Sequence, residues 1–250
     1  MNRRQFVDLA VRGSVVAAWA GSHTNLGLPR PPLPTTPELA LASKRPRKLI
    51  IPTDTPDRFG VKVMEFNPIA APDLTTWELS ISGLANRPLK LKLTDLQSLP
   101  QVAQNSRMKC VQCWSARIQW GGFRCGELLR LSQPKPTATW VRIDCADLYY
   151  DYVRMDDLLH PRTLFALKMK GEPLTPEHGA PLRLVIPFKY GYKSSKLITK
   201  LTLTDHGGQG VVADTWPYYS QNGEIEPGVD HPFDFPGETR KIKGGEIFEY

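Results

Sequence analysis

The sequence lacks any apolar run that approaches the ~20 residues needed to span a bilayer. It has no internal repeat, only 4 cysteines among its 250 residues, and no motif typical of nucleic-acid-binding proteins. We therefore expect a mature chain that does not cross a membrane and has no nucleic-acid partner, although 32 basic and 25 acidic residues leave a net charge of +7. What is present, 41% hydrophobic and 23% charged residues, is ordinary for a folded globular protein.

Short segments of period-two alternation predict a mixed α+β fold, with several strands, few and short helices, and no regular βαβ rhythm. Strands are expected at 77–82, 139–145, 164–169, 182–188 and 196–204. Short helices are expected at 94–99, with Thr94 as the N-cap, and at 126–131 and 155–160. After His206 the chain is rich in Gly, Pro and aromatic residues, which predicts irregular loops packed over the domain.

The N-terminal 56 residues differ in character from the rest. Residues 1–20 resemble a twin-arginine export signal, because Arg3 and Arg4 precede a mixed apolar run that ends in a small-x-small site at Ala20. An N-terminal amphipathic helix is the alternative interpretation. Residues 21–56 are proline-rich and read as an extended tether, which leaves 57–250 as the folded domain. Export implies a periplasmic protein.

The cysteines lie in the middle third of the chain, at positions 110, 113, 125 and 145. A disulfide, a zinc site, a redox-active dithiol and buried inert thiols are all compatible with cysteines as such. Zinc would need a second close pair or histidines at matching spacing, and a dithiol of the thioredoxin type would need a βαβ frame. Neither is present around Cys110 and Cys113, so the neighbouring residues must decide.

Two long motifs in the same order resemble the sulfite oxidase family of molybdenum enzymes. The first is RMKCVQCWS at 107–115, followed by WGGF at 120–123. The second is HGAPLRLVIP at 178–187, followed by YGYKSSK at 190–196. Residues 155–161 and Asp230-His231-Pro232 also match, so that the resemblance covers roughly 54–235. It is closest to a bacterial periplasmic branch that includes the catalytic subunit of a protein-methionine-sulfoxide reductase.

This resemblance implies a sulfite-oxidase-type catalytic domain with a molybdenum-molybdopterin cofactor, in which the Cys110 thiolate is the metal ligand. It implies a catalytic tyrosine at Tyr149, with Tyr150 as the alternative. The cofactor contacts it implies fall on Cys110, Cys145, His178, Arg183, Ser194, Ser195, Lys196, Met64 and Glu65. Two of these positions depart from the reductase branch, which has a threonine at Cys145 and a tyrosine at Met64.

The reaction that the resemblance implies is two-electron oxygen-atom transfer, either reduction of a sulfoxide or other S- or N-oxide, or oxidation of a sulfite-type substrate. The substrate would be a small or protein-bound oxidised-sulfur compound. Because no haem domain is recognised, we expect an external haem carrier, which a membrane protein can provide. We expect a monomer, since the chain ends shortly after Pro232, before a dimerisation domain. A catalytically silent pterin-binding or interaction module is the alternative.

Overall fold

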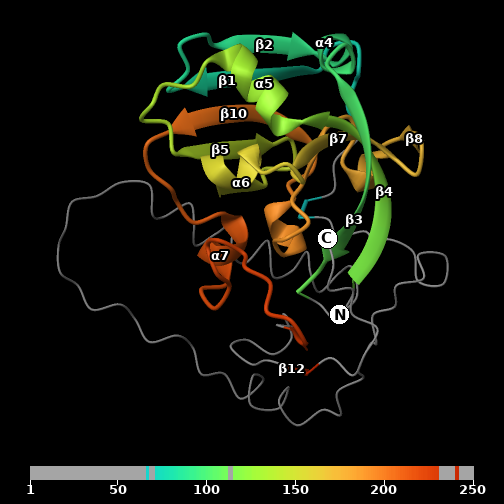
Figure 1. Ribbon diagram of the computed structural model, residues 1–250, viewed down its shortest axis with the longest axis vertical. Coiled ribbons are helices and arrows are strands. Elements are labelled where there is room, and N and C mark those ends of the chain that lie inside the picture. Colours follow the sequence, from blue (N-terminus) through green and yellow to red (C-terminus); the bar gives the residue numbers. More distant parts are fainter. Residues whose placement is uncertain (1–65, 68–70, 112–114, 231–239, 242–250) are drawn as a thin grey trace.

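The structure, a computed structural model, describes residues 66–67, 71–111, 115–230 and 240–241. Its strands form two larger sheets and a short ribbon in which β11 (Val229–Asp230) pairs with β12 (Arg240–Lys241). Figure 1 shows the first sheet at the top of the molecule and the long strands β3 (Gln101–Lys109) and β4 (Ser115–Arg124) curving down one side. The mixed α+β architecture predicted from the sequence is confirmed.

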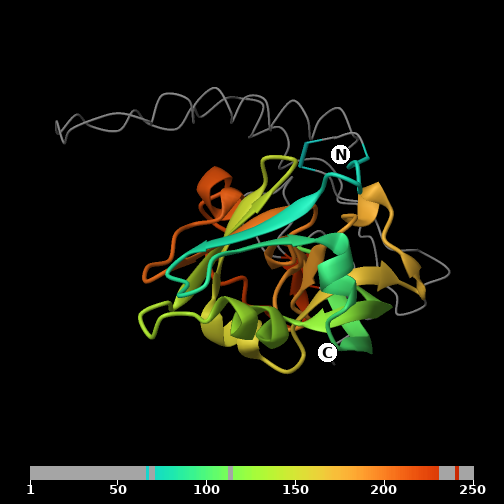
Figure 2. The ribbon, with the colours of Figure 1, turned by 90° about the horizontal axis from the view of Figure 1, so that it is seen from above.

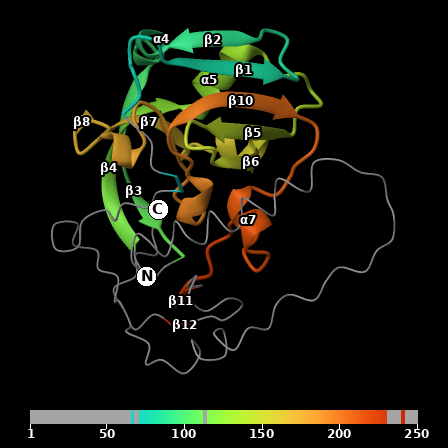
Figure 3. The same ribbon diagram turned by 180° about the vertical axis from the view of Figure 1, so that it is seen from behind.

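The first sheet has the order β2-β1-β10-β5-β6, seen from behind in Figure 3. Its β1 and β10 strands are parallel, and the other neighbours are antiparallel. The strands are β1 (Glu78–Gly83), β2 (Leu89–Lys92), β5 (Trp140–Cys145), β6 (Tyr150–Arg154) and β10 (Ile198–Thr204). Alternation explains β1, because Leu79 and Ile81 face the core while their neighbours do not.

The second sheet is antiparallel throughout. Strand β3 pairs with β4 along its whole length, and β4 pairs with β7 (Leu164–Met169). Strand β7 then pairs with both β8 (Glu172–Pro173) and β9 (Arg183–Val185). This arrangement carries the end of β3, where the first motif lies, away from the first sheet and toward the lower half of Figure 1.

Among the described residues, four short α-helices accompany the sheets: α4 (Leu93–Gln97), α5 (Cys125–Ser132), α6 (Met155–Leu159) and α7 (Val211–Thr215). Figure 2 shows α5 and α6 together on one face of the first sheet. Leu128 and Leu158 of these helices join one hydrophobic core with Leu79 and Ile143 of the sheet. A second core is formed by residues of β3, β4, β7 and α7, among others, and includes Cys110.

Several predicted elements are confirmed, and others need correction. The predicted strand 164–169 coincides with β7, and the predicted helices at 126–131 and 155–160 correspond to α5 and α6. Thr94 is not an N-cap, because α4 begins one residue earlier and the Asp95 carboxylate accepts the N–H of the true N-cap, Lys92, at 2.8 Å. Strand 182–188 shrinks to β9, and the expected loops after His206 contain α7.

Within the described ranges, no helix is both long and apolar enough to cross a membrane.

Candidate functional site

Cys110 directly follows β3, and its thiol is buried. The end of β3 lies against the second motif, because Lys109 forms an isolated parallel bridge with Tyr190. Gly191 packs so closely that a Cβ built on it would lie 3.2 Å from the Lys109 carbonyl oxygen. Further up the strand, Arg107 Nε donates to the Pro187 carbonyl at 3.2 Å. The two motifs, some seventy residues apart in the sequence, therefore meet at Cys110.

A second part of the site is the turn that connects β5 to β6. Cys145 ends β5 and donates its backbone N–H to the Tyr149 carbonyl at 2.9 Å. Burial, followed by the carboxylates of Asp147 and Asp151, raises the pKa of Cys145 well above its usual value, so this thiol stays protonated. Cys145 therefore presents a neutral thiol to this part of the site.

Tyr149 lies at the same turn and donates its hydroxyl hydrogen to the Tyr192 carbonyl at 2.5 Å. Burial raises its pKa well above the usual value, and the nearby Asp151 carboxylate adds to the effect. The hydroxyl therefore keeps its proton throughout the physiological range and acts as a hydrogen-bond donor. Tyr150, the alternative, points to another partner and donates to the Asp214 carboxylate of α7.

The third part of the site is the segment from the 3₁₀ helix η1 (Pro176–His178) to β9. Gly179 ends η1 at a positive φ of 100°, a conformation that glycine adopts without strain. The chain thereby turns so that Arg183 Nη1 donates to the His178 carbonyl at 2.9 Å. Arg183 is buried, with its guanidinium 4.8 Å from the centroid of the Trp120 ring.

The segment carries positive charge on Arg183, while its histidine is neutral. Burial lowers the pKa of Arg183 to about 10, so the guanidinium remains charged at neutral pH. Burial also lowers the pKa of His178, and the positive charges of Arg183 and Lys196 lower it further. A neutral imidazole therefore stands beside two permanent cations, which together favour an anionic group.

The Ser194-Ser195-Lys196 segment follows the 3₁₀ helix η2 (Gly191–Lys193) and runs alongside β9. Ser194 Oγ accepts the N–H of Ile186 at 3.1 Å, and the Ser195 carbonyl accepts the N–H of Leu184 at 2.8 Å. Lys196 Nζ donates to the Glu177 carbonyl at 2.7 Å. These contacts bring the serines and the lysine beside the His178–Arg183 segment.

Three buried polar atoms at this junction have no hydrogen-bond partner within the part of the chain that the structure describes. They are Arg183 Nε, Ser195 Oγ and Trp120 Nε1. Buried donors are nearly always paired in native proteins, because an unpaired one has lost its hydration without compensation. Three such atoms on adjoining strands and loops indicate the place of a polar ligand.

The structure thus brings most of the predicted site residues together. Cys145, His178, Arg183, Ser194, Ser195 and Lys196 form one neighbourhood, and Tyr149 packs against the core that contains Cys110. Met64, Glu65 and Cys113 lie outside the described residues. No group of three or more His, Cys, Asp or Glu side chains suited to a metal occurs among the described residues.

Sequence reasoning missed two residues that touch the site. Asn67 Nδ2 donates to the Asp147 carbonyl at 2.8 Å, and Phe66 packs edge-on against Tyr149 with 5.7 Å between ring centroids. Both directly follow Met64-Glu65 in the sequence. Their position after a predicted cofactor-binding pair is the signal by which they could have been found.

Comparison with known proteins shows what this chain is similar to. A family model described as "Oxidoreductase molybdopterin binding domain" matches residues 66–212. The protein-methionine-sulfoxide reductase catalytic subunit MsrP of Gluconobacter oxydans is 34% identical over 194 residues, which cover 69% of this chain and 61% of that protein. The MsrP of Campylobacter jejuni is 34% identical over 178 residues, covering 62% and 59%. The chain therefore spans about three fifths of the length of these curated relatives.

Among solved structures, the sulfane dehydrogenase SoxCD from Paracoccus pantotrophus has a similar fold. The TM-score is 0.56 at 18% identity, over 90% of this chain and 63% of that one. At this level of identity the similarity concerns the fold.

Proposed function

Since this chain belongs to the oxidoreductase molybdopterin-binding domain family, we propose that it is a molybdenum-pterin enzyme that reduces sulfoxides. Membership confirms the sulfite-oxidase-type resemblance of the two motifs and the molybdenum-molybdopterin cofactor that they imply. Two observations carry the proposal. The Cys110 thiol is buried, and Arg183 Nε and Ser195 Oγ of the neighbouring polar segment are buried donors without a hydrogen-bond partner in the described chain.

The residues present fit this cofactor. Arg183 Nε, Ser195 Oγ and Trp120 Nε1 are buried donors without partners in the described chain, as a polar pterin with its phosphate would require. His178 and Lys196 add a neutral imidazole and an ammonium group at the same place. Cys110 would hold the metal, because a soft thiolate suits molybdenum better than oxygen ligands alone. When bound, the group supplies two-electron oxygen-atom-transfer chemistry.

The protein's own residues would bind and orient the substrate and supply a proton. Reduction of a sulfoxide consumes two protons and two electrons and yields a thioether and water. We assign Tyr149 Oη, which holds its proton at neutral pH, as the hydrogen-bond donor toward the oxygen that leaves sulfur, a role in which the hydroxyl would turn from the Tyr192 carbonyl. The buried residues that share a core with Cys110 include Tyr190, Trp216 and Tyr219. Aromatic surroundings favour a neutral sulfoxide over the sulfite dianion.

Substrate, partner and location follow as parts of the same proposal. The relatives' name, protein-methionine-sulfoxide reductase, supports methionine sulfoxide, free or within a protein, as the substrate. Electrons would come from an external haem carrier. The twin-arginine pattern at Arg3-Arg4 supports export to the periplasm of the folded protein.

Metal analysis and two cysteine variants test the proposal. Protein produced in cells that make the molybdenum cofactor should contain about one molybdenum atom per chain and should reduce methionine sulfoxide with an artificial electron donor. Cys110→Ala should lose this activity and Cys113→Ala should largely keep it, because only a thiolate ligand is indispensable. Sulfite and other S- and N-oxides serve as alternative substrates in the same assay.

Absence of molybdenum from correctly produced protein would contradict the enzyme and favour a silent module. Equal losses in the two cysteine variants would overturn the ligand assignment. Oxidation of sulfite in preference to reduction of sulfoxides would reverse the proposed direction of oxygen transfer.

A further inference from the structure

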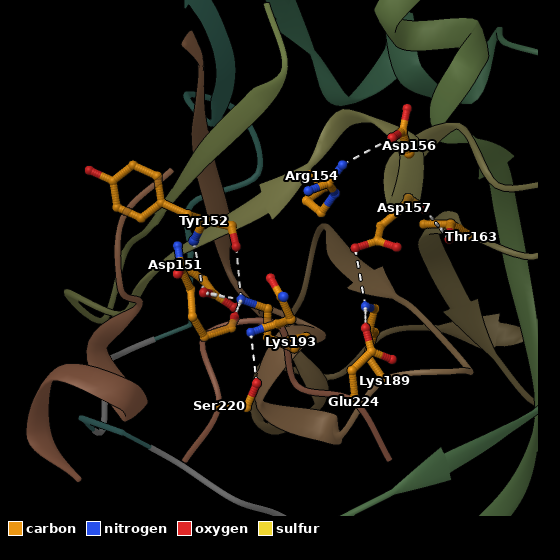
Figure 4. A network of polar contacts seen from close by, with 12 residues as sticks. Asp151, Tyr152, Arg154, Asp156, Asp157, Thr163, Lys189, Lys193, Ser220 and Glu224 are labelled. Carbon is orange, nitrogen blue, oxygen red and sulfur yellow. Dashed lines mark hydrogen bonds and ion pairs between the residues drawn. The ribbon is translucent and has the colours of Figure 1, made fainter. Parts of the chain in front are cut away.

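Two lysines of the second motif region are buried and held by acidic side chains (Figure 4). Lys193 Nζ donates to Asp151 Oδ1 at 2.5 Å and to the carbonyls of Tyr152 and Gln221, each at 2.8 Å. An ammonium group has three protons, and all three are used. Both partners are almost fully buried, with side-chain exposures of 3% for Lys193 and 2% for Asp151.

This ion pair joins the two segments that carry the predicted proton donor and the predicted cofactor contacts. Asp151 lies two residues after Tyr149. Lys193 directly follows Tyr192, whose carbonyl accepts the Tyr149 hydroxyl, and directly precedes Ser194. A displacement of Lys193 would thus shift both the acceptor of Tyr149 and the start of the Ser194–Lys196 segment.

The surroundings of the pair leave it little freedom. A Cβ built on Gly210, the N-cap of α7, would overlap the Asp151 carboxylate. A Cβ built on Gly223 would overlap the Lys193 side chain, and Gly223 has a positive φ of 66°. The chain after β10 therefore closes tightly over both charges, and close packing of this kind fixes positions to fractions of an ångström.

The second lysine offers a matched comparison. Lys189 is also buried, and its Nζ pairs with the Glu224 carboxylate and lies 3.4 Å from that of Asp157. It lies four residues before Lys193 in the same segment, yet its partners are on α6 and the C-terminal chain and not next to Tyr149. The two lysines share burial and chemistry and differ in what they hold.

We propose that Lys193, through Asp151, is a positioning residue that fixes the Tyr149 hydroxyl and the Ser194–Lys196 segment relative to Cys110. The described hydrogen bonds of the Lys193 ammonium go to Asp151 and to the carbonyls of Tyr152 and Gln221, and so not to a predicted cofactor contact. This inference rests on the proposed function, because it assigns the pair a part in catalysis beyond its contribution to folding.

Three variants test it: Lys193→Gln, Asp151→Asn and the double variant, with Lys189→Gln as the matched control. In molybdenum-loaded protein, Lys193→Gln should lower kcat for methionine sulfoxide by about tenfold to a hundredfold and leave KM nearly unchanged, as expected when a proton donor is misplaced. The double variant restores a neutral, hydrogen-bonded pair and should recover part of this loss. Lys189→Gln should lower the melting temperature and leave kcat near that of the wild type.

Hydrogen exchange of cofactor-free protein gives a readout that does not depend on activity. Peptides spanning 147–152 and 190–197 should exchange faster in Lys193→Gln and in Asp151→Asn than in wild type, and should be unchanged in Lys189→Gln. If either single variant fails to fold, the other and the double variant carry the comparison.

Equal effects of Lys193→Gln and Lys189→Gln on melting temperature, kcat and exchange would overturn the positioning role, and so would an unchanged kcat in a folded Lys193 variant. A wild type without molybdenum or sulfoxide reduction would instead refute the proposed function. In that case hydrogen exchange still decides whether the pair orders the two segments.

Discussion

At the scale of single residues, the site is defined by buried polar groups that have no hydrogen-bond partner in the described part of the chain. Arg183 is the clearest example, because it keeps its charge in the interior while its described hydrogen bond goes to a carbonyl and not to a carboxylate. The guanidinium also lies over the Trp120 ring, a cation–π contact that favours the charged form. A buried cation lowers the stability of the fold unless an anion pairs with it. A ligand that carries a phosphate would supply that anion.

His178 provides a prediction at this scale, because burial and two neighbouring cations lower its pKa. The unfolded state, with a pKa of about 6.5, then binds a proton that the folded state does not. Stability should be fully present above that pH and should fall as the pH is lowered through it, since protonation favours unfolding. His178→Asn should weaken this dependence, measured as the melting temperature of cofactor-free protein between about pH 5 and pH 8. Parallel curves for the two proteins would contradict the assignment.

At the scale of elements, the β4 strand links the two strands beside the site. It pairs with β3, which leads to Cys110, on one edge and with β7 on the other. The β4–β7 register shifts between Gly121 and Gly122, and a Cβ built on Gly122 would overlap the Phe165 carbonyl oxygen. Glycine at 122 thus allows two backbones to approach more closely than any side chain would permit.

Two glycine-to-alanine variants should act in opposite directions. Gly122→Ala should lower the free energy of unfolding by about 2 kcal/mol, because its Cβ meets backbone that cannot move aside. Gly126→Ala, in α5, should raise it by about 0.5 kcal/mol, because alanine favours the helix and its Cβ would lie 3.7 Å from Leu159, an ordinary contact. Urea denaturation of both variants measures the difference. Similar changes in the two would show that backbone approach at 122 is unimportant.

At the scale of the whole molecule, the described residues form two hydrophobic cores, and one of them contains Cys110. The core between the first sheet and helices α5 and α6 contains Leu79 and Leu158 and stabilises the fold. The other core contains Cys110, Trp120 and Tyr190 and so includes the site itself.

The resemblance of residues 1–20 to a twin-arginine signal gives a prediction at this scale. Replacing both Arg3 and Arg4 by lysine should keep the protein in the cytoplasm, because the twin-arginine route requires the arginine pair although the charge is unchanged. Fractionation of cells that express the wild type and the variant, with molybdenum measured in each fraction, checks the result. Wild-type protein should be periplasmic and loaded, and the variant cytoplasmic and loaded. A periplasmic variant would refute this route of export.

Local sequence patterns predicted those elements in which buried and exposed residues follow the period of a strand or a helix. The β7 strand and helices α5 and α6 fall where the periodicity places them. The β3–β4 hairpin was not predicted, because β3 buries Gln104, Ser106, Arg107 and Lys109, residue types that normally indicate a surface. The apolar run at 182–188 correctly predicted buried residues, but the strand there covers only β9 (Arg183–Val185).

The sequence by itself determined the family, the cofactor and the residues of the two motifs, since these depend on residue identity and spacing. The tertiary structure alone decided what those residues touch. It brought Tyr190 beside Lys109, left Arg183 Nε without a partner in the described chain, and paired Lys193 with Asp151. The physical reason is that the partner of a buried charge is chosen by contacts between residues far apart in the chain, which no local pattern encodes.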